Sequence, residues 1–206
     1  MDGVIVDSDR LHIQAERTSC DFFGINAPLS IWDEFRGTNA KTFWTHLVNN
    51  YSPNKIDLKK LTDYNYKIYL KLAEEKLELI AGSLDFIKLV REKYNKLAVA
   101  TSGAKVSQEM VFNKFGLHDY FDFVLTGDQV EHGKPHPEPY SRTVEMLSLE
   151  PHECIVIEDS DNGIISAKAA GCVAIGITTT FDKNKLIEAG ADHVVNEFKE
   201  LYDLMN

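Results

Sequence analysis

The stretch from Ile155 to Gly163 reads Ile-Val-Ile-Glu-Asp-Ser-Asp-Asn-Gly. Three β-branched residues are typical of a buried strand, and the small polar residues after them are typical of a helix start. Glu158 and Asp159 stand where the strand ends, and an unpaired acidic pair would be costly at such a place. A hard cation with oxygen ligands would resolve that cost, so the stretch predicts a magnesium site. An N-cap role for Asp159 or Ser160 is the structural alternative.

The same alternation of short apolar runs and helical patterns extends over residues 84–206. We expect strands at 97–101, 123–126, 155–157, 173–177 and 194–195, and helices near 83–94, 105–116, 137–149, 161–170 and 183–190. Strands that alternate with helices favour a parallel sheet covered on both faces. The predicted fold class is therefore α/β, a doubly wound parallel sheet.

Residues 11–79 differ, because their apolar positions recur at helical spacing and no strand-like run interrupts them. We predict three parts: residues 1–10 begin the core domain, 11–79 form an inserted all-helical cap domain, and 80–206 form the α/β core domain. A cleft between two such lobes is a natural place for a small molecule.

The composition is that of an acidic globular protein, with a formal net charge of −10 over 206 residues. An acidic chain repels a phosphate backbone, so we expect no nucleic-acid partner. No apolar run approaches the roughly 20 residues of a membrane span, so we expect no membrane partner. Three cysteines, spaced far apart, indicate free thiols in a reducing compartment. We predict a cytoplasmic protein that is a monomer.

Two further segments carry groups suited to a phosphate. Thr101, Ser102 and Gly103 follow a predicted strand, where hydroxyl and backbone N–H donors can hold phosphate oxygens. An ordinary helix cap is the alternative for this turn. Lys134 lies in a Gly-Lys-Pro turn and could neutralise an anion, or could be a solvated surface lysine. Ligands of parallel sheets bind outside the carboxyl ends of the strands, so we expect these segments to converge.

Four segments in order resemble the haloacid dehalogenase-like superfamily. They are Met1-Asp-Gly-Val-Ile-Val-Asp-Ser8, Ala98-Val-Ala-Thr-Ser-Gly103, Gly133-Lys-Pro-His-Pro137 and Ile155–Gly163, and the tail at 190–195 agrees with them. The chain is most similar to the helical-cap branch that includes small-metabolite phosphatases and β-phosphoglucomutase. The resemblance implies a Rossmann-like core and a Mg²⁺-dependent phosphatase. Its substrate would be a small phosphorylated metabolite such as a sugar phosphate, hydrolysed through an aspartyl-phosphate intermediate.

The resemblance also implies a role for individual residues. Asp2 matches the general acid and base, whose backbone carbonyl binds the metal. The implied catalytic residues are Asp2, Thr101 and Lys134; the substrate-binding residues are Ser102, Gly103 and Arg36; the metal residues are Asp2, Glu158 and Asp159.

The nucleophile of the family is an aspartate two residues before Asp2, and the given chain starts at Met1. Three explanations stay open: an incomplete sequence, an expressed truncation, or a pseudoenzyme that binds phosphorylated ligands without turnover. We favour the first. The chain as given is then expected to be inactive, and an upstream apolar strand ending in Asp should restore activity.

Two other functions stay open. In β-phosphoglucomutase a cap-loop arginine grips the second phosphate; Ala40 takes its place here, although Arg36 or Lys41 could substitute. A phosphomutase is therefore the second enzyme hypothesis. The non-enzyme hypothesis is a phosphate-ligand binding protein. A dehalogenase is disfavoured, because it needs no metal and would not keep Asp2, Glu158 and Asp159 together.

Overall fold

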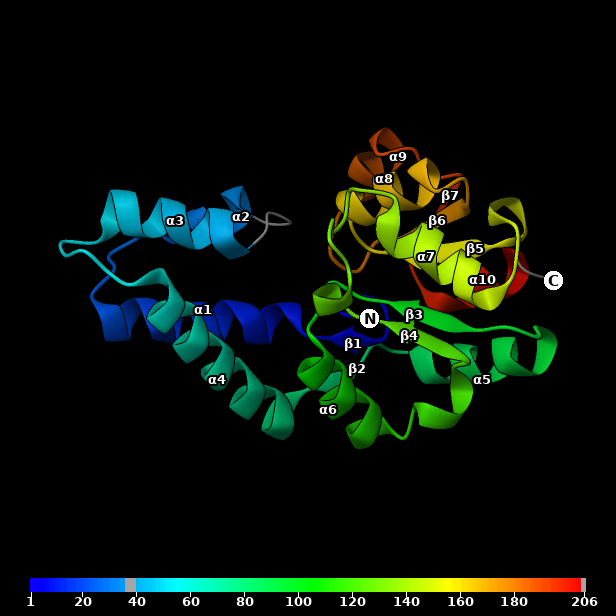
Figure 1. Ribbon diagram of the computed structural model, residues 1–206, viewed down its shortest axis with the longest axis horizontal. Helices are drawn as coiled ribbons and strands as arrows, with labels where there is room; N and C mark the ends of the chain where they lie inside the picture. The colour runs from blue at the N-terminus through cyan, green and yellow to red at the C-terminus, as the bar shows by residue number, and fades with distance from the viewer. Residues whose placement is uncertain (36–39, 205–206) are drawn as a thin grey trace. The chain divides into compact units, whose positions relative to one another are not determined.

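The computed structural model describes residues 1–35 and 40–204, which form two compact units (Figure 1). One unit combines Met1–Asp7 with Glu78–Asn206, and the other is Ser8–Leu77. The chain therefore leaves the first unit after Asp7 and re-enters it after Leu77, where the sequence predicted boundaries after residues 10 and 79.

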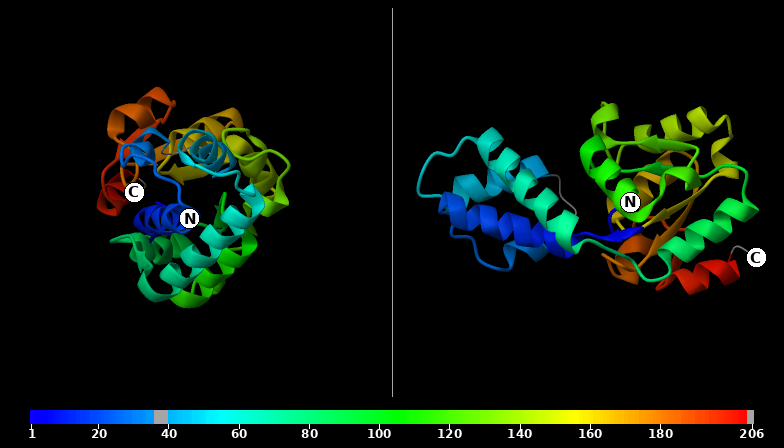
Figure 2. Two further views of the ribbon diagram at one scale, coloured as in Figure 1. Left: turned by 90° about the vertical axis from the view of Figure 1, so that its left-hand side faces the viewer. Right: turned by 90° about the horizontal axis from the view of Figure 1, so that it is seen from below.

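The unit Ser8–Leu77 is helical throughout its described residues. It contains α1 (Asp9–Phe23), α2 (Ile31–Glu34), α3 (Ala40–Tyr51) and α4 (Leu58–Lys76). The long helices α1 and α4 pack along each other, as Figure 2 shows. Trp44, Leu47 and Leu61 are fully buried in its core. The sequence of this part shows no strand-like alternation, and its described elements are all helices.

The other unit alternates strands and helices, as predicted. Its parallel strands are β3 (Ala98–Ala100), β4 (Phe123–Leu125), β5 (Ile155–Glu158), β6 (Val173–Ile177) and β7 (His193–Val195). Its helices are α5 (Ser83–Lys93), α6 (Lys105–Phe115), α7 (Glu138–Leu147), α8 (Asp161–Ala169), α9 (Lys183–Glu188) and α10 (Phe198–Leu204). The predicted α/β class is confirmed.

Helices cover the strands from two sides (Figures 1 and 2). One apolar cluster joins α5 and α10 to β6 and β7 through Phe86, Ile175, Ile177 and Phe198. A second cluster joins α7, α8 and α9 to β6 through side chains that include Tyr140, Ile164 and Leu186. The two clusters place helices on both faces of the strands, which is the doubly wound arrangement.

The strands pair in separate ladders among the described residues. β3 pairs with β4, and β5 pairs with β6 and β6 with β7, all in parallel. A short antiparallel pair was not expected: β1 (Val6–Asp7) lies beside β2 (Glu78–Leu79), where the chain passes between the units. Two-residue strands carry too little pattern to be recognised in a sequence.

A cavity of about 240 Å³ lies between β3 and β5. Its lining is mainly apolar and includes Val99 from β3, Val156 and Ile157 from β5, and Met1. Within residues 1–35 and 40–204, no ladder joins β3 to β5 across this cavity. The cavity therefore has a parallel strand on either side. In the described residues, no helix is long and apolar enough to cross a membrane.

Candidate active site

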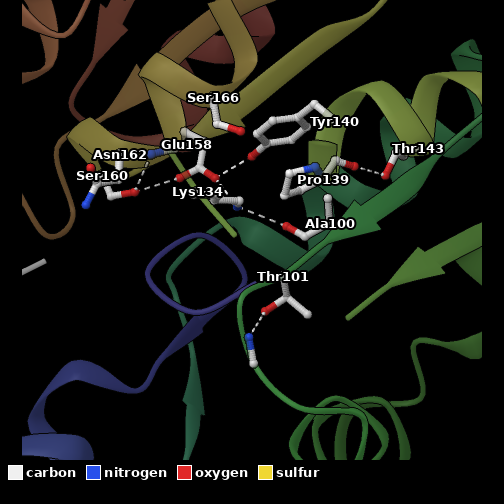
Figure 3. Close-up of polar contacts among 12 residues, drawn as sticks. Ala100, Thr101, Lys134, Pro139, Tyr140, Thr143, Glu158, Ser160, Asn162 and Ser166 are labelled. Carbon is white, nitrogen blue, oxygen red and sulfur yellow. Dashed lines mark hydrogen bonds and ion pairs between the residues drawn. The ribbon is translucent and has the colours of Figure 1, made fainter. Parts of the chain in front are cut away.

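Residues from three of the four predicted segments lie together at the carboxyl ends of β3 and β5 (Figure 3). Thr101 follows β3, Glu158 ends β5, and Lys134 reaches between them from the loop before α7. In a parallel sheet these strand ends share one edge, which explains why residues far apart in the sequence meet here.

Lys134 and Glu158 form a buried ion pair. The exposed fractions of their side chains are 11% and 6%, and the Lys134 ammonium donates to Glu158 Oε1. It also donates to the backbone carbonyl of Ala100 at 3.1 Å. Lys134 is therefore held at the site by two acceptors, and the alternative of a solvated surface lysine is wrong.

Glu158 accepts hydrogen bonds on both carboxylate oxygens. Oε1 also receives the hydroxyl of Tyr140, and Oε2 receives the hydroxyl of Ser160 at 3.1 Å. Burial would raise the pKa of Glu158, but the charge and hydrogen bond of Lys134 and the Tyr140 hydroxyl outweigh it and lower the pKa to about 2. Glu158 is thus a carboxylate at any physiological pH.

Gly163 allows this arrangement at the start of α8. A Cβ at this position would lie 2.1 Å from Glu158 Oε2, so any side chain would displace the carboxylate. The glycine that ends the motif is therefore required by the close approach of Glu158 to the helix.

Asp159 has a different environment from its neighbour. Burial and then the negative charge of Glu158 raise its pKa from 3.8 to about 6, although a hydrogen bond from Thr180 acts in the opposite direction. Its Oδ2 lies 1.9 Å from where a Cβ of Gly3 would stand, so the carboxylate lies against the backbone next to Asp2. Of these two adjacent carboxylates, Asp159 is the one whose charge the surrounding protein compensates less.

Asp2 lies beside the turn after β3. A Cβ at Gly103 would be 3.6 Å from Asp2 Oδ2 and 3.3 Å from Thr101 Oγ1, so these three residues are neighbours. Thr101 is buried and accepts the Gly103 N–H at 3.0 Å, whereas Ser102 is exposed. The structure therefore brings the predicted general acid next to the predicted phosphate-binding turn.

The helix caps near the site settle the two structural alternatives. Ala104 is the N-cap of α6 and offers no side chain, while Asp128 accepts the Lys105 N–H at 3.2 Å. Thr101 is thus not the helix cap. For α8 the N-cap is Ser160, whose hydroxyl accepts the Gly163 N–H at 3.1 Å. Ser160 fills the capping role that the sequence left open, and Asp159 remains available for another.

A divalent cation fits part of this edge. Among residues 1–35 and 40–204, no three His, Cys, Asp or Glu side chains gather into a ready metal group. The partly buried Asp159, with its raised pKa and its place against Gly3, has the property of a carboxylate that a cation would stabilise. Glu158 is less open to a cation, because protein donors already occupy both of its oxygens.

Sequence reasoning missed two residues of this site. Tyr140 and Thr180 contact Glu158 and Asp159, but a tyrosine in a helix and a threonine in a loop follow no pattern that would identify them. Arg36, the predicted substrate-binding residue, lies outside the described residues.

Known proteins similar to this chain are phosphatases and related hydrolases. A phosphorylated carbohydrates phosphatase from Thermotoga maritima is 29% identical, over 98% of this chain and 96% of that protein. A validoxylamine A 7'-phosphate phosphatase from Streptomyces hygroscopicus subsp. limoneus is 29% identical, over 92% and 88%. The crystal structure of a candidate β-phosphoglucomutase from Thermotoga maritima is 28% identical, with a TM-score of 0.82 over 100% of this chain and 95% of that one.

A comparison with models of protein families gives a match over most of the chain. Residues 1–177 match the haloacid dehalogenase-like hydrolase family, a span that includes all four segments of the site. The predicted superfamily and the prediction of a hydrolase are both confirmed. This match agrees with the α/β fold and with the residues gathered at the carboxyl ends of β3 and β5. The chain therefore belongs to the haloacid dehalogenase-like hydrolase family.

Proposed function

We propose that this protein is a Mg²⁺-dependent phosphatase of a small phosphorylated metabolite, working through an aspartyl-phosphate intermediate. One observation carries the proposal: the Lys134–Glu158 pair and Asp159 lie at one sheet edge, where Asp2 stands beside the Thr101–Gly103 turn. Phosphate monoesters are dianions that hydrolyse very slowly in water, so catalysis requires positive charge, donors and a proton source together.

The chain's own residues supply these functions in the proposal. Lys134 neutralises charge on the phosphate, and the Thr101 hydroxyl and the Ser102 N–H hold its oxygens. The Gly103 N–H donates to Thr101 Oγ1, so Gly103 acts by shaping the turn around the phosphate. Asp2 gives a proton to the leaving oxygen and later takes one from the attacking water. The buried ion pair keeps Lys134 in place for this work.

Asp159, with Asp2 and Glu158 beside it, would hold the Mg²⁺ ion. The fit rests on Asp159, whose charge the protein compensates only in part, and the acceptor oxygens are the type that Mg²⁺ prefers. When bound, the ion would neutralise charge on the phosphate and on the acidic residues. Glu158 would contribute mainly by fixing Lys134, since its oxygens already accept protein hydrogen bonds.

The nucleophile is the part of the proposal that lies beyond the given residues. The resemblance assigns it to an aspartate two positions before Asp2. Met1 lines the cavity between β3 and β5, so a strand leading into Met1 would run between two parallel strands and present such an aspartate at the same edge. Apolar lining on both sides suits an apolar strand.

The substrate class comes from the relatives. Several are phosphatases of sugar-like or small phosphorylated compounds, such as the phosphorylated carbohydrates phosphatase and a fructose-1-phosphate phosphatase from Escherichia coli. We propose a phosphorylated sugar or a similarly small phosphate ester as the substrate of this chain.

The test is phosphate release by an extended chain, in which an apolar strand that ends in Asp precedes Met1, because the 206 residues alone are expected to be inactive. Its substrates are p-nitrophenyl phosphate and a panel of sugar phosphates, nucleotides and short phosphorylated acids. It is carried out with Mg²⁺ and with a chelator in its place. We expect turnover with Mg²⁺ only, and its loss in Lys134→Ala. Turnover that persists in the chelator, or in Lys134→Ala, would contradict the proposal. Binding of phosphate without turnover on any ester would favour the binding-protein hypothesis.

The phosphomutase remains a second candidate because of the 28% identity to the candidate β-phosphoglucomutase. A phosphomutase would isomerise a sugar monophosphate in the presence of a sugar bisphosphate, whereas a phosphatase would release inorganic phosphate. If Arg36 only holds the substrate, Arg36→Ala should raise KM more than it lowers kcat.

A further inference from the structure

Tyr140 contacts both members of the buried ion pair. It is the third residue of α7, its side chain is 7% exposed, and its hydroxyl donates to Glu158 Oε1. The Lys134 ammonium lies 4.9 Å from the centre of the Tyr140 ring. One side chain therefore supports the carboxylate through its hydroxyl and the ammonium through its ring, as Figure 3 shows for the hydroxyl.

The Tyr140 hydroxyl affects whether an N–H donor of Lys134 is available to a ligand. An ammonium has three N–H donors. Here one goes to the Ala100 carbonyl and one to Glu158 Oε1, which leaves the third for an anion at this edge. Glu158 Oε1 receives Tyr140 as well as Lys134, so its charge is shared between two donors.

If the Tyr140 hydroxyl were removed, Glu158 Oε1 would stay buried, and of its two donors only Lys134 would remain. A buried charge that loses a hydrogen bond interacts more strongly with its remaining partner. Glu158 would then hold the ammonium more tightly and compete with an incoming phosphate. The Tyr140 ring, with its centre 4.9 Å from the ammonium, attracts the positive charge and limits where it can move.

We propose that Tyr140 is a positioning residue. Its hydroxyl donates to Glu158 Oε1 alongside Lys134, weakens the hold of the carboxylate on the ammonium, and so leaves a Lys134 N–H for the phosphate of the substrate. This inference rests on the proposed function, because it assigns phosphate to the same edge. Tyr140 itself acts through Lys134 and has no proposed contact with the substrate.

The test compares Tyr140→Phe with Thr143→Val. Phenylalanine removes the hydroxyl and keeps the ring in its apolar cluster. Thr143 is buried on the same helix, but its hydroxyl donates to the Pro139 carbonyl at 2.7 Å and does not take part in the ion pair. All variants are made in the extended chain with the upstream strand and its Asp. The readouts are the Kd of inorganic phosphate by calorimetry in Mg²⁺, kcat and KM for p-nitrophenyl phosphate, and the thermal midpoint of each variant.

We expect Tyr140→Phe to weaken phosphate binding about tenfold, which corresponds to about 1.4 kcal/mol. Thr143→Val should change phosphate binding by less than about twofold, on the scale set by losing a local hydrogen bond elsewhere. Equal phosphate binding in Tyr140→Phe and the wild type would overturn the inference. Equal losses in both variants would also overturn it, because they would reflect helix packing alone.

A double-mutant cycle tests whether Tyr140 acts through Lys134. In a Lys134→Met background, Tyr140→Phe should have little further effect on phosphate binding, because the group it positions is gone. An undiminished effect in that background would overturn the inference. An extended chain that binds phosphate but hydrolyses no ester contradicts the proposed function only, and the phosphate affinities still decide the role of Tyr140. A wild type that binds no phosphate contradicts both.

Discussion

Glu158 carries a buried negative charge that pairs with Lys134. Its pKa is lowered to about 2 from an ordinary 4.5, so it stabilises the folded state fully above pH 4.5 and loses that contribution as the pH falls towards 2. Glu158→Gln removes the partner of a buried ammonium, which typically costs about 3 kcal/mol.

We therefore expect Glu158→Gln to lower the free energy of unfolding by about 3 kcal/mol at pH 7, and by less near pH 3. Urea unfolding at the two pH values measures this. Glu188→Gln, at an exposed position in α9, is the control and should change stability by less than about 0.5 kcal/mol. A loss that is the same at both pH values would show that Glu158 is not ionised in the folded chain.

Asp159 should show the opposite trend, because its pKa is raised to about 6 from 3.8. The folded chain without metal binds this proton more tightly than the unfolded chain, so its stability should fall as the pH rises from 4 to 6. Mg²⁺ competes with the proton, and its apparent affinity should fall about tenfold per pH unit below pH 6.

Calorimetric titration of Mg²⁺ between pH 5 and 8 measures this competition. Asp159→Asn should weaken Mg²⁺ binding and remove most of the pH dependence, while Asp161→Asn, whose carboxylate pairs with Lys185 at 3.2 Å, should leave both unchanged. A Mg²⁺ affinity that is equal in Asp159→Asn and the wild type would show that the ion binds elsewhere.

At the scale of elements, α8 and α9 begin with comparable caps but differ in what the caps touch. Ser160 accepts the Gly163 N–H and also donates to Glu158, whereas Asp182 accepts the Lys185 N–H at 3.0 Å. Ser160→Ala and Asp182→Ala should each cost about 1 kcal/mol of stability. Only Ser160→Ala should also lower turnover of p-nitrophenyl phosphate, and a similar loss in both variants would exclude a specific role for Ser160.

The helical unit is proposed to act as a cap that closes over the substrate and excludes water. The two strands β1 and β2, at Val6–Asp7 and Glu78–Leu79, lie where the chain passes between the units. Hydrogen-exchange protection of residues 7–12 and 79–83 should increase when vanadate and Mg²⁺ are added together. Protection that stays unchanged while the ligand binds would argue against a hinge at this place.

Most elements of the α/β unit follow from hydrophobic periodicity, which is why β6 and α6 were predicted almost residue for residue. The pattern is weak where an element is short, so β2 was missed. The site was predictable where a charged or hydroxyl residue directly follows a strand, as in Thr101 and Glu158. Tyr140 could not be predicted, because its contact with Glu158 depends on how α7 packs against β3, β4 and α8.

For the whole molecule, the cavity between β3 and β5 connects stability with catalysis. An apolar strand leading into Met1 would fill about 240 Å³ of mainly apolar space and bring its last residue to the edge that holds Lys134 and Glu158. Filling such a space stabilises a fold, since unfilled apolar volume costs roughly 24 cal/mol per Å³ in a well-studied enzyme. The same strand would supply the proposed nucleophile.

The central claim is that phosphoryl transfer takes place at this edge through an aspartate two positions before Asp2. The most direct measurement is Mg²⁺-dependent phosphate release by the given chain and by two longer chains. The longer chains carry about eight extra residues that encode an apolar strand, with either Asp or Asn at that position; this length suits a typical strand. The account predicts activity for the Asp chain alone, with a loss of roughly a million-fold in the Asn chain, as when a nucleophile is removed from a cooperative site. Hydrolysis by the Asn chain or by the given 206 residues at the rate of the Asp chain would contradict it.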